Sequence, residues 1–522
     1  MVNLGPGSSR RTLLRGAAVG GGVATAVALP GAAEAVTYRP ARWRGARLLS
    51  PADRHLAARF SAGVTPDLTS EVRAAGGGRA WFERQLKPGR IKDGPADQLG
   101  DWWPSLRFGP AELWRRQVQE IEFGWQVMES YQRWLLLRRI RTKRQVQEVM
   151  TEFWLNHLNV PANGDAAFTW RFDYDRKIRA RALGSFRDIL YAAVTHPAMG
   201  IYLDNAVSTK GHPNENLGRE LLELHTVGRG EYTEADVKDS ARILTGWGVD
   251  LWRTWAAEYS PEDHWVGPVK VMGFEHRNQN PDGRETTRDY LTYLARHPAT
   301  ARRIARRLAT KFVSDQPPRA LVDRLARVYL ANDTEIRPVL RTLVESTAFR
   351  EARGAKVRDP IEDVVATYRA LGVRLHRPPA NDDDHATRAV LWQCHGVGAE
   401  PHGWPRPDGP PLDNESWATP ARMLASMDVH WVMSGSWWPK QGITYREHRD
   451  WLPRREVRLD VLVDYLSQQL LGIRSTARLL QACCEVTGLR PRTLITADHG
   501  LVRWDFHRLL STILDSPAHL TR

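Results

Sequence analysis

Apolar residues recur every three to four positions over most of this chain, the spacing of one face of an amphipathic helix. Strict alternation of apolar and polar residues, which is typical of a half-buried strand, is almost absent. We therefore predict a mainly α-helical fold that forms one large multi-helix domain. The helical pattern covers residues 48–86 (as short helices), 110–137, 142–158, 174–196, 216–225, 234–247, 286–296, 298–313, 319–331, 335–346, 361–371 and 420 to the end.

Two long segments lack this pattern and are predicted to be irregular loops. Residues 248–284 are rich in Trp, Pro, Gly, Asp and His, and residues 378–420 contain the string Pro405-Arg-Pro-Asp-Gly409. Long loops inside a compact domain are often functional, so both are candidates for lining a site. The second loop also offers a candidate sub-boundary near 376–420 within the single domain predicted for 36–522.

The first 35 residues have the organisation of an export signal. Ser9-Arg-Arg-Thr-Leu-Leu-Arg15 matches the twin-arginine signal, a weakly apolar run follows at 16–29, and Ala33-Glu-Ala35 is typical of a cleavage site. The run is short for a permanent membrane anchor, and no second long apolar run follows. We expect residues 1–35 to be removed after passage through the twin-arginine translocase, leaving a secreted protein without a transmembrane anchor. Because this route carries folded proteins, often after cofactor loading, it also favours a bound metal ion.

Charge and composition narrow the class of partner. Lys and Arg number 74 against 60 Asp and Glu, a net charge of +14, and such a surface favours anionic partners such as an acidic polysaccharide. No recognisable nucleic-acid-binding module accompanies the charge, so no specific nucleic-acid partner is predicted. The 21 tryptophans offer flat faces that can stack on sugars, although any one of them more often packs in a core.

The three cysteines are Cys394, Cys483 and Cys484, and their spacing is not that of a metal site. A disulfide between Cys394 and either Cys483 or Cys484 is compatible with the sequence, which does not decide whether it forms.

Polar residues are densest between Gly211 and His225. A turn at Gly211–Pro213 starts a helix near Asn214, and Leu217, Leu221 and Leu224 form its apolar stripe. Another face of the same helix carries Asn216, Arg219, Glu220 and Glu223. This convergence predicts a functional site, while a structural Arg–Glu network is the alternative interpretation.

Several strings together resemble one large bacterial family. They are Ala80-Trp-Phe-Glu-Arg-Gln-Leu86, Phe153-Trp-Leu-Asn-His157, Pro197-Ala-Met-Gly-Ile-Tyr-Leu-Asp-Asn205, Pro213-Asn-Glu-Asn216, Glu220-Leu-Leu-Glu-Leu-His-Thr226, Leu244-Thr-Gly-Trp247 and Pro405-Arg-Pro-Asp-Gly409. From about Leu48 to the C-terminus the chain resembles the secreted family called domain of unknown function 1800. The resemblance implies a helical fold, export and a co-exported partner that resembles sulfatases, but no reaction. The chain departs from the family pattern at Asp263-His264, where relatives often have His-Asp.

Two kinds of chemistry fit these residues. A divalent metal ion could be held by imidazoles and neighbouring carboxylates, which suit zinc, iron or manganese, although no diagnostic metal motif is present. The candidate ligands are His157, His225 and His264. Metal-free hydrolysis needs paired carboxylates whose pKa values differ. The candidate catalytic residues are Glu215, Arg219, Glu220 and Glu223, and the candidate substrate-binding residues are Asn156, Asn214, Asn216, Trp247, Trp404 and Asp408.

Two functions follow as hypotheses. The first is a hydrolase that acts on an extracellular polymer such as a polysaccharide. The second is a non-catalytic protein that binds an anionic polymer or the sulfatase-like partner. Neither a Gly-x-Ser-x-Gly elbow nor a phosphate-binding glycine loop occurs, so serine-hydrolase and nucleotide chemistry are not predicted.

Overall fold

The computed structural model describes residues 40–164, 166–379 and 385–522. The predicted export signal at 1–35 lies outside these described residues. Residues from Pro40 onward form one compact unit. Within the described ranges, no helix has the length and apolar character needed to cross a membrane.

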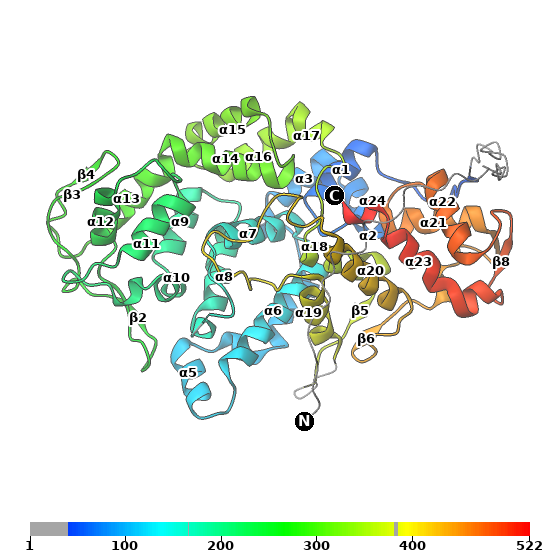
Figure 1. Ribbon diagram of the computed structural model, residues 1–522, viewed down its shortest axis with the longest axis horizontal. Helices are drawn as coiled ribbons and strands as arrows, with labels where there is room; N and C mark the ends of the chain where they lie inside the picture. The colour runs from blue at the N-terminus through cyan, green and yellow to red at the C-terminus, as the bar shows by residue number, and fades with distance from the viewer. Residues whose placement is uncertain (1–39, 165, 380–384) are drawn as a thin grey trace, which may run out of the picture. The chain divides into compact units, whose positions relative to one another are not determined.

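Helices dominate this unit, and the prediction of a mainly α-helical fold is confirmed (Figure 1). The N-terminal part contains α1 (Pro51–Arg59), α2 (Pro66–Ala74), α3 (Gly78–Gln85), η1 (Pro88–Arg90), α4 (Gly94–Asp97), η2 (Gln98–Asp101), η3 (Pro104–Arg107), α5 (Pro110–Val118), α6 (Gly124–Arg141), α7 (Gln145–His157), η4 (Ala167–Thr169), α8 (Arg171–Arg181), α9 (Phe186–Val194), α10 (Pro197–Tyr202), η5 (Asn205–Val207), α11 (Glu215–Glu220), η6 (Leu221–His225) and α12 (Glu234–Ile243). The remaining helices are α13 (Arg284–Arg296), α14 (Pro298–Phe312), α15 (Arg319–Ala331), α16 (Ile336–Glu345), α17 (Thr347–Glu351), α18 (Pro360–Leu371), α19 (Ala386–Val397), α20 (Pro420–Ser434), η7 (His448–Trp451), α21 (Leu459–Leu471), α22 (Ala477–Thr487), η8 (Leu501–Asp505), α23 (Phe506–Leu514) and α24 (Pro517–Leu520).

Local capping chemistry explains where several helices begin. Thr233 and Asp236 form a reciprocal capping box at the start of α12, as the sequence predicts. Two predicted helices are each divided in two. The pattern at 110–137 breaks between α5 and α6, where Glu120 adopts a left-handed φ of 54°. The pattern at 174–196 breaks before Ser185, whose hydroxyl caps α9.

The two segments predicted to be irregular contain regular structure, which corrects that part of the prediction. Residues 248–284 include most of two antiparallel hairpins, the first pairing β1 (Trp247–Val249) with β2 (Ala257–Tyr259) and the second pairing β3 (Val269–Val271) with β4 (Phe274–His276). Strands of three residues are too short to show a recognisable alternation. The segment 378–420 contains α19, which His385 caps at its start and Gly398 ends in a left-handed conformation. The other short strands are β5 (Arg374–Leu375), which pairs with β6 (Ile443–Thr444), and β7 (Glu456–Arg458), which pairs with β8 (Leu494–Thr496).

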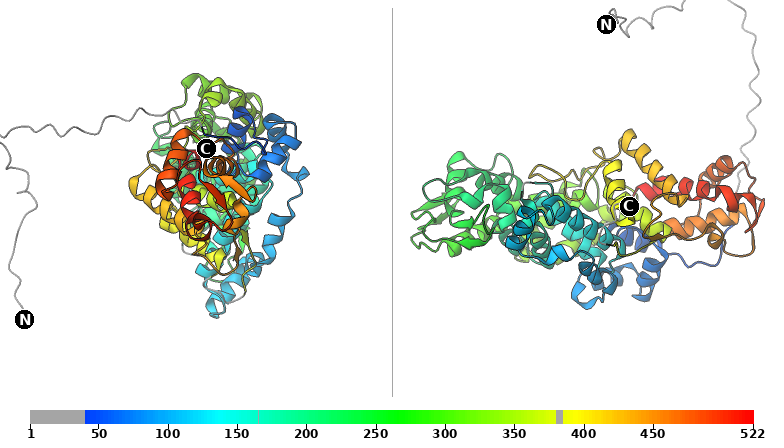
Figure 2. Two further views of the ribbon diagram at one scale, coloured as in Figure 1. Left: turned by 90° about the vertical axis from the view of Figure 1, so that its right-hand side faces the viewer. Right: turned by 90° about the horizontal axis from the view of Figure 1, so that it is seen from below.

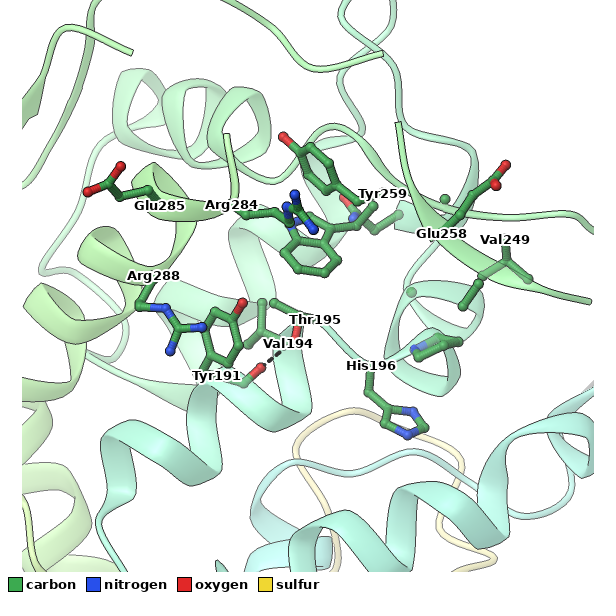
Figure 3. Close-up of a pocket in the computed structure, with 16 residues that line it drawn as sticks. Tyr191, Val194, Thr195, His196, Val249, Glu258, Tyr259, Arg284, Glu285 and Arg288 are labelled. Atoms are coloured by element: carbon green, nitrogen blue, oxygen red, sulfur yellow. Dashed lines mark hydrogen bonds between the residues drawn. The ribbon is translucent and has the colours of Figure 1, made fainter. Parts of the chain in front are cut away.

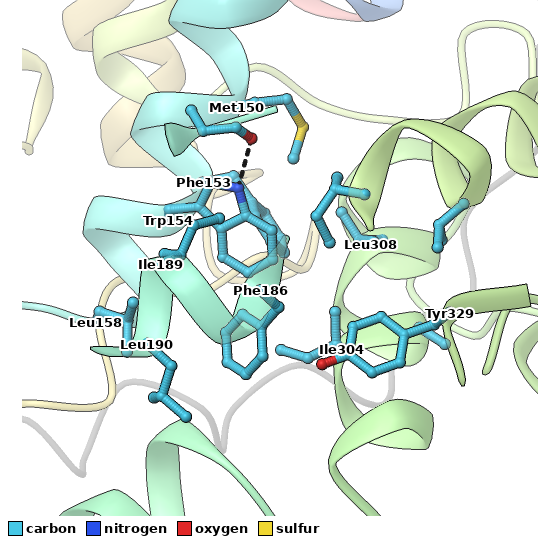
Figure 4. Packing of buried hydrophobic residues seen from close by; sticks show 14 of the residues in the cluster. Met150, Phe153, Trp154, Leu158, Phe186, Ile189, Leu190, Ile304, Leu308 and Tyr329 are labelled. Carbon is cyan, nitrogen blue, oxygen red and sulfur yellow. Dashed lines mark hydrogen bonds between the residues drawn. The ribbon is translucent and has the colours of Figure 1, made fainter. Parts of the chain in front are cut away.

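A continuous apolar core joins helices that are distant in sequence. Trp154 of α7, Phe186 of α9 and Ile304 of α14 pack together in Figure 4, and Trp154 and Phe186 rings lie 5.4 Å apart. The indole nitrogen of Trp154 donates to the carbonyl of Ala182, which satisfies its only polar group. This core holds the C-terminal end of α7 rigidly against α9 and α14, and the predicted site residues Asn156 and His157 occur there.

The helices beyond residue 420 pack mainly on one another. Helix α23 contacts α20, α21 and α22, and α18 connects this group to α6 and α19 (Figures 1 and 2). All three cysteines are free thiols, so the disulfide that the sequence left open is not formed.

Candidate functional site

The polar segment singled out in the sequence forms a short α-helix followed by a π-helical turn. Asn214 caps α11, its side-chain oxygen accepting from the backbone nitrogen of Asn216. After Glu220 the chain widens into the π-turn η6, in which Leu221 and Leu222 are buried. Such turns are rare and are frequently found at functional sites.

Arg219 links α11 to α12. Its guanidinium binds both carboxylate oxygens of Glu234 at 2.7 Å and lies 3.6 Å from Glu215. These groups face solvent, where such a pair contributes at most about 1 kcal/mol. Through its bond to Glu234, Arg219 therefore connects α11 to α12 at the surface. Asn216 lies on the same exposed side of α11, and its amide nitrogen is 3.4 Å from a carboxylate oxygen of Asp204.

Glu220 and Glu223 experience opposite electrostatic environments. Burial, followed by the neighbouring charge of Glu223, raises the pKa of Glu220. Hydrogen bonds from Tyr232 (2.7 Å) and Arg229 lower the pKa of Glu223. Two adjacent carboxyls separated in this way are the arrangement that acid–base catalysis uses.

His157 and His225 form a reciprocal pair beneath this turn. His157 Nε2 donates to the carbonyl of His225, and His225 Nδ1 donates to the carbonyl of His157, both at 3.0 Å. Both rings are buried, and burial lowers the pKa of His225 to about 4 and that of His157 well below its usual range. The pair ties the end of α7 to η6 as two neutral imidazoles.

The second nitrogen of His225, Nε2, is buried and has no hydrogen-bond partner among the described residues. The guanidiniums of Arg303 and Arg307, both on α14, lie close enough to lower the pKa of His225 further. Positive neighbours of this kind oppose binding of a metal cation.

His264 is buried away from this pair. Its Nδ1 lies 3.1 Å from the carbonyl of Thr245, and its Nε2 lies 3.0 Å from the side-chain oxygen of Asn278. Both ring nitrogens are therefore engaged, one with Thr245, which precedes the first hairpin, and the other with Asn278, which follows the second hairpin.

Two groups of acids and histidines in the described part of the chain bring three ligand-type atoms within 4.8 Å of one another. They are Asp363, His430 and His519, and Glu152, Asp359 and Glu362. Neither group includes His157, His225 or His264, whose metal role stays a prediction. The first group fits a metal poorly, because Arg422 and Ser426 already donate to Asp363. The second faces Lys311, which donates to Glu362 at 2.9 Å.

The loop that carries Trp404 and Asp408 packs onto the end of α7. Asn159 donates to the carbonyls of Trp404 and Arg406, both at 2.8 Å, and the indole of Trp404 donates to Asp408 at 2.9 Å. A Cβ at Gly409 would overlap the carbonyl oxygen of Asn156, so only glycine permits this approach.

Asp408 is also close enough to Glu220 to raise its pKa. The structure thus gathers seven of the predicted residues in one region: Asn156, His157, Glu220, Glu223, His225, Trp404 and Asp408. Their functional roles stay predictions.

Trp247 belongs to a different place, an open groove of about 730 Å³ (Figure 3). We call it the basic groove, and its walls come from α9, α10, the β1–β2 hairpin and α13. The lining residues are Tyr191, Val194, Thr195, His196, Pro197, Gly200, Asn205, Trp247, Gly248, Val249, Ala257, Glu258, Tyr259, Arg284, Glu285 and Arg288. An adjoining hollow of about 580 Å³ shares several of these residues and adds Lys177 and Arg181.

Arg284 and Arg288 line the basic groove together with Glu258 and Glu285, and each arginine lies over a tyrosine ring. The guanidinium carbon of Arg288 lies 4.3 Å from the centroid of Tyr191, and that of Arg284 lies 5.4 Å from Tyr259. Trp247 packs edge-on against Tyr259 with ring centroids 5.0 Å apart. Arg284 is paired with Asp282 at 2.6 Å, whereas no carboxylate of the described residues makes an ion pair with Arg288.

A histidine–aspartate pair stabilises the floor of the groove. His196 caps α10 by accepting from the backbone nitrogen of Ala198 at 3.1 Å, and its other nitrogen donates to Asp173 at 3.2 Å. Burial lowers the pKa of His196 and outweighs the opposing effect of Asp173. The imidazole is therefore neutral near pH 7, with its proton on Nε2.

Fold and groove together define a mainly helical protein with an open groove lined by aromatic, basic and acidic side chains. Residues 55–521 match the family described as protein of unknown function (DUF1800), and the chain belongs to that family. No curated protein and no solved structure matches it. The resemblance found in the sequence strings is thereby confirmed at the level of the family.

Sequence reasoning selected one residue of the basic groove, Trp247, and missed the others. Arg284 and Arg288 are four residues apart, a spacing that would indicate a basic helix face if the predicted helix at 286–296 began two residues earlier, as α13 does. Tyr191 and Tyr259 carried no comparable signal, because only the fold brings α9 and the hairpin to the same groove.

Proposed function

We propose that this protein binds an anionic extracellular polymer, of the acidic polysaccharide kind, in the basic groove. The observation that carries the proposal is Arg288, an exposed guanidinium held over Tyr191 without a carboxylate partner among the described residues. An arginine in this state offers its planar donors to a carboxylate or sulfate group of a ligand.

The rest of the groove supports a polymeric ligand. Trp247 offers an aromatic ring beside the arginines, suited to the apolar face of a sugar ring. Lys177 and Arg181 line the adjoining hollow together with Asp173, which is bonded to His196, and Asp188, which is paired with Arg187. Further acidic units of the same chain would meet the positive charge of Lys177 and Arg181 there. The proposal includes export by the twin-arginine translocase and, as a further partner, the co-exported sulfatase-like protein.

Replacing Arg288 by alanine is expected to weaken binding of an acidic oligosaccharide about 10- to 100-fold, because a charge-assisted hydrogen bond contributes roughly 1.5–3 kcal/mol. Isothermal titration calorimetry of the mature protein with an oligogalacturonate would measure this change. Arg327→Ala is the matched control, since Arg327 is an exposed arginine of α15 that does not line the groove. If both substitutions weakened binding equally, the loss would come from the change in net charge rather than from the groove, and the proposal would be contradicted.

Hydrolysis of the polymer is the second candidate function, and the Glu220–Glu223 pair favours it. Glu220 has a raised pKa and suits a general acid, while Glu223 has a lowered pKa and stays ionised. The hydroxyl of Tyr202 donates to the carbonyl of Pro405 at 2.7 Å. Burial, followed by the nearby charge of Glu220, raises the pKa of Tyr202.

If Glu220 is a general acid, Glu220→Gln should lower the rate of polymer cleavage at least about 100-fold, the usual contribution of acid–base catalysis. The release of reducing ends from acidic polysaccharides measures the rate, and thermal unfolding checks that the fold is intact. Glu231→Gln, at an exposed position in the loop after η6, is the control. If the unaltered protein binds these polymers but releases no reducing ends, hydrolysis is excluded and only the binding function is retained.

A further inference from the structure

A second hollow, of about 630 Å³, lies where α5 and α6 meet the tip of the β1–β2 hairpin. We call it the tryptophan hollow. It shares no lining residue with the basic groove or its adjoining hollow. Its volume falls within the roughly 300–1,000 Å³ of small-molecule sites. The residues that carry the argument are Trp114, Gln117, Trp125, Gln132, Asn163 and Trp252.

Three indole rings line this hollow, and two of them are exposed to an unusual degree. Trp125 is 63% exposed and Trp252 is 62% exposed. Trp114 packs edge-on against Trp252 with centroids 5.6 Å apart, and the buried Trp255 supports both rings from behind at 5.2 Å. Large apolar side chains held at the edge of a cavity mark a ligand-binding surface.

The loop of the β1–β2 hairpin that carries Trp252 has a strained backbone. Trp252 and Trp255 adopt left-handed φ values of 64° and 56°. This conformation costs a bulky residue on the order of 1 kcal/mol or more. Asp250 offsets part of the cost by accepting from Arg253 and Thr254, both at 2.7 Å. Backbone strain of this kind persists only where the surrounding structure supports it.

Side-chain amides provide the polar part of the hollow. The carbonyl oxygen of Gln117 accepts from the backbone nitrogen of Gly124 at 2.6 Å, which orients its amide hydrogens as donors. The amide nitrogen of Gln132 donates to Glu400 and to the carbonyl of Pro401, which orients its own carbonyl as an acceptor. Asn163 contributes a third amide. Fixed donors and acceptors beside flat apolar faces match the hydroxyls and C–H faces of a pyranose ring.

The charged residues around the tryptophan hollow bear on whether its ligand is anionic, cationic or uncharged. The carboxylates among its described lining residues, Glu129 and Glu400, disfavour an anion. Arg388 donates to Glu129 and balances its charge, whereas Glu400 accepts from the neutral amide of Gln132 at 2.8 Å and stays anionic. The choice of an uncharged ligand over a cation therefore depends on the oriented amides of Gln117 and Gln132.

We infer that the tryptophan hollow is a binding site for a neutral oligosaccharide, with a sugar ring stacked on Trp252 and its hydroxyls bound by Gln117 and Gln132. This site is separate from the anionic-polymer site and does not depend on it. A protein with both sites would hold two kinds of glycan at once.

Titration calorimetry of the mature protein with cellotetraose and with chitotetraose tests this inference. We expect binding of at least one of them, weakened 10-fold or more in Trp252→Ala. Trp504→Ala is the matched control, because Trp504 is 76% exposed and lines neither site, and it should bind like the unaltered protein. Gln117→Ala should also weaken binding without changing the hairpin.

The outcomes separate this site from the basic groove. Arg288→Ala should leave neutral-sugar binding unchanged, and Trp252→Ala should leave oligogalacturonate binding unchanged. The inference is overturned if neither tetrasaccharide binds at millimolar concentration, if Trp504→Ala weakens binding as much as Trp252→Ala, or if tetramethylammonium competes for the site as an aromatic-cage ligand would.

Discussion

Replacing Asp363 by alanine is expected to lower the free energy of unfolding by about 3–5 kcal/mol, the usual cost of removing one partner from a buried ion pair. Asp363 lies on α18 and is 1% exposed. One of its oxygens accepts from Arg422 at 3.0 Å and from Ser426 at 2.6 Å, and the other lies 3.3 Å from His430. Without the carboxylate, a guanidinium and an imidazolium stay buried with less compensating charge.

Urea denaturation at pH 7 measures this loss. Asp323→Ala is the matched control, because Asp323 is a solvent-facing acid of α15 whose nearest basic partner, Arg319, lies 3.8 Å away. We expect the control to change stability by less than about 1 kcal/mol. A second variant, Asp363→Ala combined with Arg422→Met, should recover part of the loss because it also removes a buried charge. A loss below 1 kcal/mol in Asp363→Ala would show that water reaches this network.

The same network should make the protein less stable as the pH rises from about 6.5 to 9. Burial alone would lower the pKa of His430, but the charges and hydrogen bonds of Asp363 and Asp515 outweigh it and raise the pKa to about 9. A group whose pKa is higher in the folded state stabilises the fold fully below its unfolded pKa of about 6.5. This contribution, on the order of 3 kcal/mol, is lost as the pH rises through 9.

Thermal unfolding across this pH range, compared between the unaltered protein and His430→Gln, measures the effect. The variant should be less stable at pH 6.5, and its stability should change little up to pH 9. Both proteins should still lose stability on the acid side, because burial lowers the pKa of His519 and of His225 to about 4 and protonation then favours the unfolded state. Parallel alkaline profiles for the two proteins would contradict the assignment of the charge to His430.

The predicted site is partly assembled in the structure, and the reason for each outcome is local. Asn156 and His157 lie at the C-terminal end of α7, and the core around Trp154 carries that end to η6. Arg219, a candidate catalytic residue, binds Glu234 of the next helix at 2.7 Å and lies 3.6 Å from Glu215 of its own helix. Sequence spacing placed Arg219 and Glu220 near each other, but the direction of each side chain depends on how α11 packs against α12.

The sequence alone determined the helical class, most helix positions and the family, because these depend on local periodicity, capping residues and contiguous strings. The sequence pattern did not predict α19 or the short hairpins. A three-residue strand is stabilised mainly by its partner strand and by the residues it packs on, which the local pattern does not show.

The tertiary structure alone decided which polar groups share a surface. Tyr191, Trp247 and Arg288 are far apart in the chain and meet in the basic groove only because α9, the hairpin and α13 pack around the same core. Asp363 of α18, His430 of α20 and Asp515, which follows α23, are likewise far apart in the chain. Burial, hydrogen bonding and pKa are properties of these non-local contacts, and for that reason local sequence patterns do not contain them.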